Sequence, residues 1–243
     1  MTDPRKTAAE LATSLEAKLG ARLHSVLLFG SVARGEAIEG VSDINILVLL
    51  DRVDASALEA AGPLARRWAK AGNTVPLVMA EDEWRRATDV FAIELSDMKD
   101  AHEILHGRDP LAELEVDPAA LRLQVEREIR GKLLQLREGM LVSADDEAAL
   151  GRLLMVALPS FVTYLRATLR LLGRAVPTKS PDVIAEAAAR IGVDPKALLR
   201  VWEARATARP LHAGVADPLV HDFYALAEAT AAFVDQLSES RSE

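Results

Sequence analysis

The chain of 243 residues contains no cysteine. This absence excludes a disulfide scaffold, a thiolate metal site and a cysteine nucleophile, and it leads us to expect a cytoplasmic protein. The first residues carry charges every few positions and lack the apolar core of a secretion signal. No stretch approaches the roughly 20 uninterrupted apolar residues of a membrane span. We therefore expect neither a standard export signal nor an interaction with a membrane.

Aromatic residues make up only 4% of the chain, and negative charges outnumber positive ones. The 29 Lys and Arg residues against 37 Asp and Glu residues give a formal net charge of −8, which disfavours nonspecific attraction to nucleic acid. The three tryptophans are isolated in the sequence, so a platform for stacking single-stranded bases is not supported. Half of the residues are hydrophobic, which predicts a globular protein of one or two domains. The net charge and the isolated tryptophans lead us to expect no nucleic-acid partner.

The first half of the chain alternates between helical and strand periodicities. Apolar residues spaced four apart predict a helix over 3–19, with Asp3 as its N-cap. Short apolar or alternating runs predict strands over 24–29, 43–50 and 74–79, and a further helix is predicted over 55–71. Two strand–helix–strand passages imply a mixed sheet with helices packed on it, which is an α/β fold.

The second half of the chain shows only helical periodicity. A residue able to cap a helix precedes proline at four places, and this pair favours the first turn of a helix. Together with long apolar stripes over 118–141 and 146–173, these starts predict an all-α bundle of five helices. We expect a first domain over 1–112 and a second over 118–238. The four pairs are Asp117-Pro118, Ser180-Pro181, Asp194-Pro195 and Asp217-Pro218.

The segment that carries chemistry begins where the first strand ends. Gly30 and Ser31 follow this strand and open a short helix, which brings backbone N–H groups, the positive helix end and a hydroxyl to one point. Such a point suits a polyphosphate. Asp43 begins the next strand, and Asn45 lies two residues on, so both point to one face. Their oxygen atoms suit Mg²⁺ beside those phosphates.

At these residues the sequence resembles the polymerase-beta-like nucleotidyltransferase superfamily. The pattern Phe29-Gly30-Ser31, eleven residues, then Asp43-Ile44-Asn45-Ile46 matches the family in spacing and order. The run GSVARGEA followed by a Ser-Asp pair is similar to the small bacterial branch that includes minimal and aminoglycoside nucleotidyltransferases. The resemblance implies an α/β core followed by a helical bundle.

The resemblance also implies a function and a set of site residues. Gly30 and Ser31 would bind the phosphates of a nucleoside triphosphate, and Asp43 and Asn45 would occupy the catalytic, magnesium-binding positions. A nucleoside monophosphate would pass to a hydroxyl of a small-molecule or protein acceptor, and pyrophosphate would be released. Neither the acceptor nor the oligomeric state follows from the resemblance.

The departures from the family pattern concern its acids. The second acid is Asn45 here, and the third acid has no counterpart in 74–79. Because nucleotidyl transfer with two metal ions needs anionic ligands, we expect weak magnesium binding that depends on the nucleotide. Glu81, Asp82 and Glu83 follow the third strand and either substitute for the missing acid or cap the next helix. The alternative function is a catalytically impaired nucleotide-binding or regulatory module, such as a toxin–antitoxin-type partner.

Other charged residues near the motif allow two interpretations each. Arg34 lies one turn beyond Ser31, so it either touches the triphosphate or pairs with Glu36 or Glu39. His102 and His106 are four residues apart and would share a helical face. Because no acid completes a metal set with them, packing or surface roles are favoured for both histidines.

Overall fold

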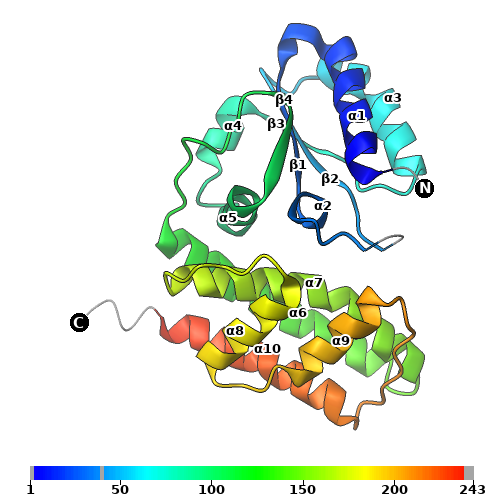
Figure 1. Ribbon diagram of the computed structural model, residues 1–243, viewed down its shortest axis with the longest axis vertical. Helices are drawn as coiled ribbons and strands as arrows, with labels where there is room; N and C mark the ends of the chain where they lie inside the picture. The colour runs from blue at the N-terminus through cyan, green and yellow to red at the C-terminus, as the bar shows by residue number, and fades with distance from the viewer. Residues whose placement is uncertain (1–2, 39–40, 238–243) are drawn as a thin grey trace. The chain divides into compact units, whose positions relative to one another are not determined.

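The computed structural model describes residues 3–38 and 41–237. The chain divides into two compact units, Met1–Asp117 and Pro118–Glu243 (Figure 1). The N-terminal unit contains the sheet and the motif, and the C-terminal unit is helical throughout its described part. Each unit is described by itself below.

The N-terminal unit is built on a four-stranded mixed sheet with the order β3-β2-β1-β4. β1 pairs antiparallel with β2 and with β4, whereas β2 and β3 are parallel. The three predicted strands are confirmed, but the fourth lies where a helical face was predicted around the two histidines. The strands are β1 Leu23–Phe29, β2 Asn45–Leu50, β3 Leu77–Ala80 and β4 His102–Gly107.

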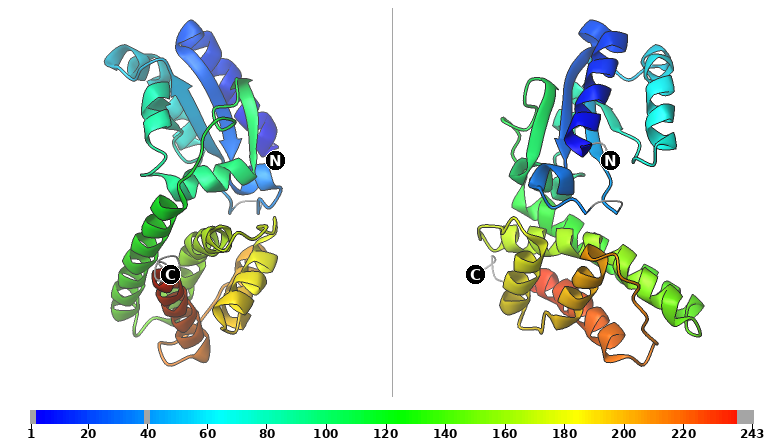
Figure 2. Two further views of the ribbon diagram at one scale, coloured as in Figure 1. Left: turned by 90° about the vertical axis from the view of Figure 1, so that its left-hand side faces the viewer. Right: turned by 45° about the vertical axis from the view of Figure 1, so that its right-hand side comes forward.

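Helices cover both faces of this sheet (Figures 1 and 2). Because side chains alternate along a strand, Val48 and Leu50 join the core under α1 and α3, while Leu47 and Leu49 join the core on the opposite face. Burying each such aliphatic side chain stabilises the fold by about 1.5–3 kcal/mol. The first face carries α1 Pro4–Leu19 and α3 Ala55–Lys70. The opposite face carries α4 Glu81–Arg86 and α5 Ala92–Asp100. Two short helices, η1 Gly20–Arg22 and α2 Ser31–Arg34, precede and follow β1.

Aspartates cap both helices of the first face, as helix-start signals in the sequence indicate. Asp3 accepts a hydrogen bond from the Arg5 backbone N–H at 2.9 Å, and Asp54 accepts one from the Ala57 backbone N–H at 2.9 Å. Each cap satisfies a donor that the first helical turn leaves without an intrahelical partner.

The C-terminal unit is the predicted bundle of five helices. Asp217, a cap that the sequence indicates, accepts from the Leu219 N–H, and Asp146, at the predicted start of the second long helix, accepts from the Ala149 N–H, each at 2.8 Å. Within residues 118–237 the structure shows no strand. The helices are α6 Pro118–Val142, α7 Glu147–Leu171, α8 Ser180–Ile191, α9 Lys196–Ala206 and α10 Pro218–Gln236.

Helix α7 is both long and apolar. By length and composition alone it is able to cross a membrane, contrary to the expectation that no segment would approach such a span. Half of its most apolar window is buried inside the structure, and α7 contacts α6, α8, α9 and α10. Its apolar side chains therefore have partners within the bundle, as the core helix of a globular unit requires.

Candidate nucleotide site

The turn between β1 and α2 has a backbone conformation that requires glycine. Gly30 has φ 78° and ψ −150°, a region that side chains rarely allow. A Cβ atom at Gly30 would lie 2.8 Å from Nδ2 of Asn45, so a larger residue would both strain the backbone and displace the Asn45 side chain. The structure thus brings together two of the predicted site residues, one from each strand of the motif.

Helix α2 has only four residues, Ser31 to Arg34. Its dipole is therefore small, and phosphate binding at this point would depend on the N–H groups of the turn and on the Ser31 hydroxyl. Ser31 is partly exposed, and its hydroxyl has no hydrogen-bond partner among the described residues. The hydroxyl is available to a ligand without breaking an existing bond.

Asp43 and Asn45 differ in their surroundings. Asp43 is exposed just before β2, and within the described part of the chain its carboxylate forms no hydrogen bond or ion pair. Asn45 is the first residue of β2, opposite Phe29 in the register with β1. The amide nitrogen of Asn45 lies against Gly30, so its amide oxygen is turned away from the glycine. These two positions supply one free carboxylate and one amide oxygen.

Arg34 is engaged in an ion pair rather than pointing into solvent. Its Nη2 donates to Oδ2 of Asp97 on α5 at 2.7 Å, and the two side chains are only 9% and 13% exposed. The partner lies 63 residues further along the chain and was not the one expected; Glu39 lies outside the described residues. A contact between Arg34 and a phosphate would require this pair to open.

A second arginine also contacts α2. Nη2 of Arg5, on α1, donates to the Val32 carbonyl oxygen at 2.8 Å, and its Nε donates to Oε1 of Glu103 at 2.7 Å. Sequence reasoning missed Arg5, because an arginine in the first turn of a helix carries no signal of a contact 27 residues away. Together, Arg5 and Asp97 fix the short helix that follows the motif glycine.

The acidic residues after β3 do not replace the missing third acid. β3 runs parallel to β2 and places Ala80 beside Leu50, whereas Asn45 begins β2. Glu81 therefore follows the end of the sheet that is about 17 Å from Asn45, at about 3.3 Å per residue. Oε2 of Glu83 accepts a hydrogen bond from the Ala80 N–H at 3.2 Å, which confirms the capping interpretation.

The donor set limits the kind of metal site that the unit can form. Among the described residues, no three His, Cys, Asp or Glu side chains form a group suited to a metal ion. His102 and His106 lie on β4, where His102 contacts the Met98 carbonyl oxygen and His106 lies 3.5 Å from Glu16. One carboxylate and one amide fit a single Mg²⁺ that brings further oxygen ligands with a triphosphate, and they do not fit a pair of ions.

Comparison with known sequences and structures assigns this unit to a family. The sequence model of the nucleotidyltransferase domain matches residues 9–117. This range spans β1, the glycine turn, Asp43 and the whole sheet. The N-terminal unit is a nucleotidyltransferase domain of the polymerase-beta-like superfamily.

A solved structure extends the likeness beyond the nucleotidyltransferase domain. Spectinomycin adenyltransferase AAD(9) from Enterococcus faecialis, crystallised with ATP and spectinomycin, superimposes with a TM-score of 0.60 at 11% sequence identity. The match covers 93% of this chain and 98% of that chain. None of the curated proteins matches the sequence. At this identity the likeness concerns the fold, and it confirms the expected nucleotidyltransferase core followed by helices.

Proposed function

We propose that the nucleotidyltransferase domain binds a nucleoside triphosphate together with Mg²⁺ and transfers its nucleoside monophosphate to a hydroxyl of a small molecule. The observation that carries the proposal is the joined motif: the strained Gly30 turn lies against Asn45, beside an unpaired Ser31 hydroxyl and an exposed Asp43 carboxylate. The fold shared with an enzyme solved with ATP and spectinomycin supports a small, hydroxyl-bearing acceptor.

Each residue of the motif has a distinct part in this proposal. Backbone N–H groups of the turn and the Ser31 hydroxyl donate hydrogen bonds to phosphate oxygens. The absent side chain at Gly30 leaves room for the phosphates to approach the backbone. Asp43 would hold the magnesium ion, with Asn45 Oδ1 as a neutral second ligand. When bound, Mg²⁺ neutralises charge that develops on the phosphate oxygens.

The proposed reaction breaks the bond between the α-phosphorus and the bridging oxygen to the β-phosphate. The acceptor oxygen forms a new bond to the α-phosphorus, its proton is released, and pyrophosphate leaves. β3 and the residues before it, 74–76, contain no acid that could take this proton. Because a positioned general base contributes about 10²–10⁴-fold to a rate, we expect slow turnover.

The second candidate function is a nucleotide-binding module without catalysis. Asn45 favours it, because an amide ligates a metal ion without supplying charge. The two candidates differ in one observable: the module binds the magnesium nucleotide without releasing pyrophosphate, whichever acceptor is added.

The deciding experiment titrates the parent chain, Asn45→Asp and Asp43→Asn with each nucleoside triphosphate, with and without Mg²⁺, by calorimetry. Asn45→Asp should strengthen magnesium-dependent binding by about tenfold or more, because a restored charge at an effective dielectric near 20 is worth on the order of 1 to a few kcal/mol. Asp43→Asn should abolish the magnesium dependence. Pyrophosphate release with hydroxyl-bearing aminocyclitols then separates the transferase from the binding module.

Asp89→Asn is the matched control, because Asp89 is an exposed aspartate outside the motif. It should bind nucleotide like the parent chain. Equal magnesium dependence in the parent, Asn45→Asp and Asp43→Asn would remove both positions from the nucleotide site and contradict the proposal.

A further inference from the structure

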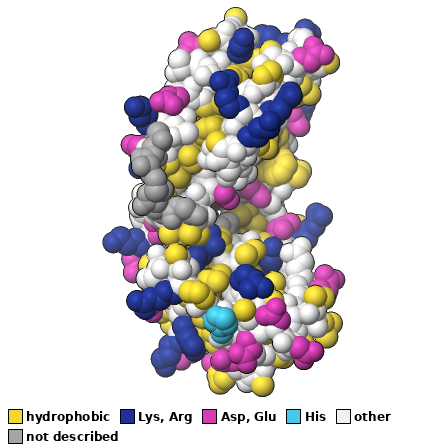
Figure 3. Space-filling view, turned by 90° about the vertical axis from the view of Figure 1, so that its right-hand side faces the viewer, with side chains coloured by type: hydrophobic (Ala, Val, Ile, Leu, Met, Phe, Trp, Pro, Cys, Tyr) yellow, Lys and Arg dark blue, Asp and Glu magenta, His cyan; other side chains and the backbone are white. Residues whose placement is uncertain are grey.

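Helix α3 has an uncharged ridge along its solvent side. Ala55, Leu58, Gly62, Ala65 and Ala69 follow each other at intervals of three or four residues, so they share one face of the helix. Leu58 is 52% exposed, Ala55 and Ala69 are exposed, and the other two are partly exposed. In Figure 3, which shows the side of the molecule that carries α1 and α3, hydrophobic side chains lie between Lys and Arg side chains of the N-terminal unit.

The ridge adjoins a sheet edge that is equally free of charge. β3 is the last strand in the sheet order, and its outer edge pairs with no strand of the described chain. The segment from Thr74 to Ala80 contains no charged residue, and Val75 and Leu77 are 60% and 39% exposed. Soluble proteins usually protect such an edge with lysine, other charges or proline; here Pro76 is the one protective residue in this segment.

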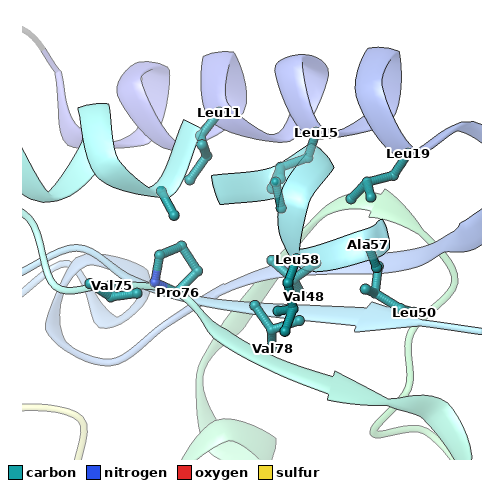
Figure 4. A pocket seen from close by; sticks show the side chains of 12 residues that line it. Leu11, Leu15, Leu19, Val48, Leu50, Ala57, Leu58, Val75, Pro76 and Val78 are labelled. Carbon is teal, nitrogen blue, oxygen red and sulfur yellow. The ribbon is translucent and has the colours of Figure 1, made fainter. Parts of the chain in front are cut away.

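An apolar pocket connects the ridge to the edge. It has a volume of about 40 Å³ and is lined only by apolar side chains, including Leu58 and Ala65 of α3, Val75 and Val78. Figure 4 shows the leucines of α1 pointing toward the sheet on one side of this pocket and Leu58 close to the sheet. The apolar surface is therefore continuous from α3 to β3.

Gly62 leaves the middle of the ridge without a side chain. It precedes Pro63 inside the helix, and glycine there avoids the clash between a Cβ atom and the proline ring. Apart from its chain neighbours, a Cβ atom at Gly62 would meet nothing within 4 Å. Another helix can therefore approach the backbone closely at this position.

Charged residues beside the ridge have a pattern that identifies the approaching helix. Glu59 and Arg66 flank the ridge on one side, seven residues apart, and neither forms a hydrogen bond or ion pair within the described part of the chain. If a second copy of α3 runs antiparallel, with a two-fold axis at Gly62–Pro63, Glu59 of each copy lies opposite Arg66 of the other. This one pair of positions is complementary in charge across such an axis.

We propose that two copies of this chain associate through α3 and the outer edge of β3, related by a two-fold axis. Leu58 of one copy then packs between Ala65 and Ala69 of the other, so that a large residue meets two small ones. The same axis places the two β3 edges antiparallel to each other, where their free N–H and C=O groups can pair. Such an isologous interface is the commonest arrangement of soluble homodimers.

The test measures the molar mass of the full chain by sedimentation equilibrium up to about 100 μM, a range that detects micromolar dimers. The parent chain should dimerise, and Leu58→Glu should raise the dimer dissociation constant at least about tenfold, as loss of a central apolar contact does. Leu141→Glu is the matched control: Leu141 is 80% exposed on α6 in the C-terminal unit, and its substitution should leave the dissociation constant unchanged.

A charge exchange tests the orientation of the two helices. Glu59→Arg and Arg66→Glu should each weaken the dimer about tenfold, and the double variant should return to within about threefold of the parent value. Both residues are exposed, and circular dichroism with thermal unfolding checks that every variant folds. A monomeric parent chain, a dimer indifferent to Leu58→Glu, or a double variant weaker than either single variant would each overturn the proposal.

Discussion

At the two ends of the sheet, polar side chains differ in whether they form hydrogen bonds or ion pairs. At the end where β1 finishes, Ser31 and Asp43 form no hydrogen bond or ion pair through their side chains within the described residues. At the end where β1 begins, the Glu81 carboxylate contacts His24, Arg85 and Arg108. Because Asp43 is exposed and Ser31 is partly exposed, both groups are accessible to the ligand that we propose at the first end.

The same contrast holds for the loops. Beyond the end of β2, Arg22 pairs with Asp51 at 3.2 Å and with Asp54 at 3.1 Å. Around the motif, the charged residues that are paired, Arg5 and Arg34, hold α2 rather than facing the turn. At this end of the sheet, Arg5 and Arg34 therefore position α2 and the turn. Ser31 and Asp43 are the residues that we propose contact the ligand.

The largest expected effect tests the buried pair behind the motif. Asp97→Ala leaves the guanidinium of Arg34 buried without this partner and should lower the free energy of unfolding by about 3 kcal/mol. Asp82→Ala, which breaks an exposed pair with Arg86 at the opposite end of the sheet, should lower it by less than about 0.5 kcal/mol. Urea denaturation measures both. Similar losses in the free energy of unfolding would show that burial does not make the Arg34–Asp97 pair more important for stability than the Arg86–Asp82 pair.

The next effect concerns the glycine of the motif. Gly30→Ala combines backbone strain with a clash against Asn45 and should cost about 2 kcal/mol of stability. Gly20 precedes β1 at the opposite end of the sheet and has φ 55°, but a Cβ atom added there would meet no atom within 4 Å. Gly20→Ala should therefore cause a smaller loss of stability. Thermal unfolding compares the variants. Adding Asn45→Ala to Gly30→Ala should recover the part of the loss that the clash causes, and no recovery would contradict the role of Asn45.

The smallest expected effect is a pH dependence of stability that comes from Asp54, at the end of the sheet opposite the motif. The hydrogen bond from the Ala57 backbone N–H, with help from Arg22 and Ser56, lowers the pKa of Asp54 from 3.8 to about 2. A carboxyl group with a lowered pKa stabilises the fold fully above its unfolded pKa, and this contribution is lost as the pH falls from about 4 to about 2. Asp54→Asn should flatten the decline of the melting temperature over that interval.

Several elements were predictable because their signals are local. Helix starts at Asp3 and Asp217 follow from the preference of a capping side chain for the first turn. β1 and β2 follow from apolar runs next to glycine or aspartate. β4 was missed, because its sequence HEILHG does not alternate between polar and apolar residues, its two histidines are spaced as on a helical face, and its pairing with β1 is nonlocal.

The order of elements, several helix starts and the spacing of the nucleotidyltransferase motif could be predicted, because each depends on residues within a few positions of one another. The contact of Asn45 with Gly30, the pairing of Arg34 with Asp97 and the position of Glu81 at the end of the sheet opposite the motif emerged only from the fold. Those facts depend on strand register and on packing between distant segments, and one chain without its fold contains no local signal for either.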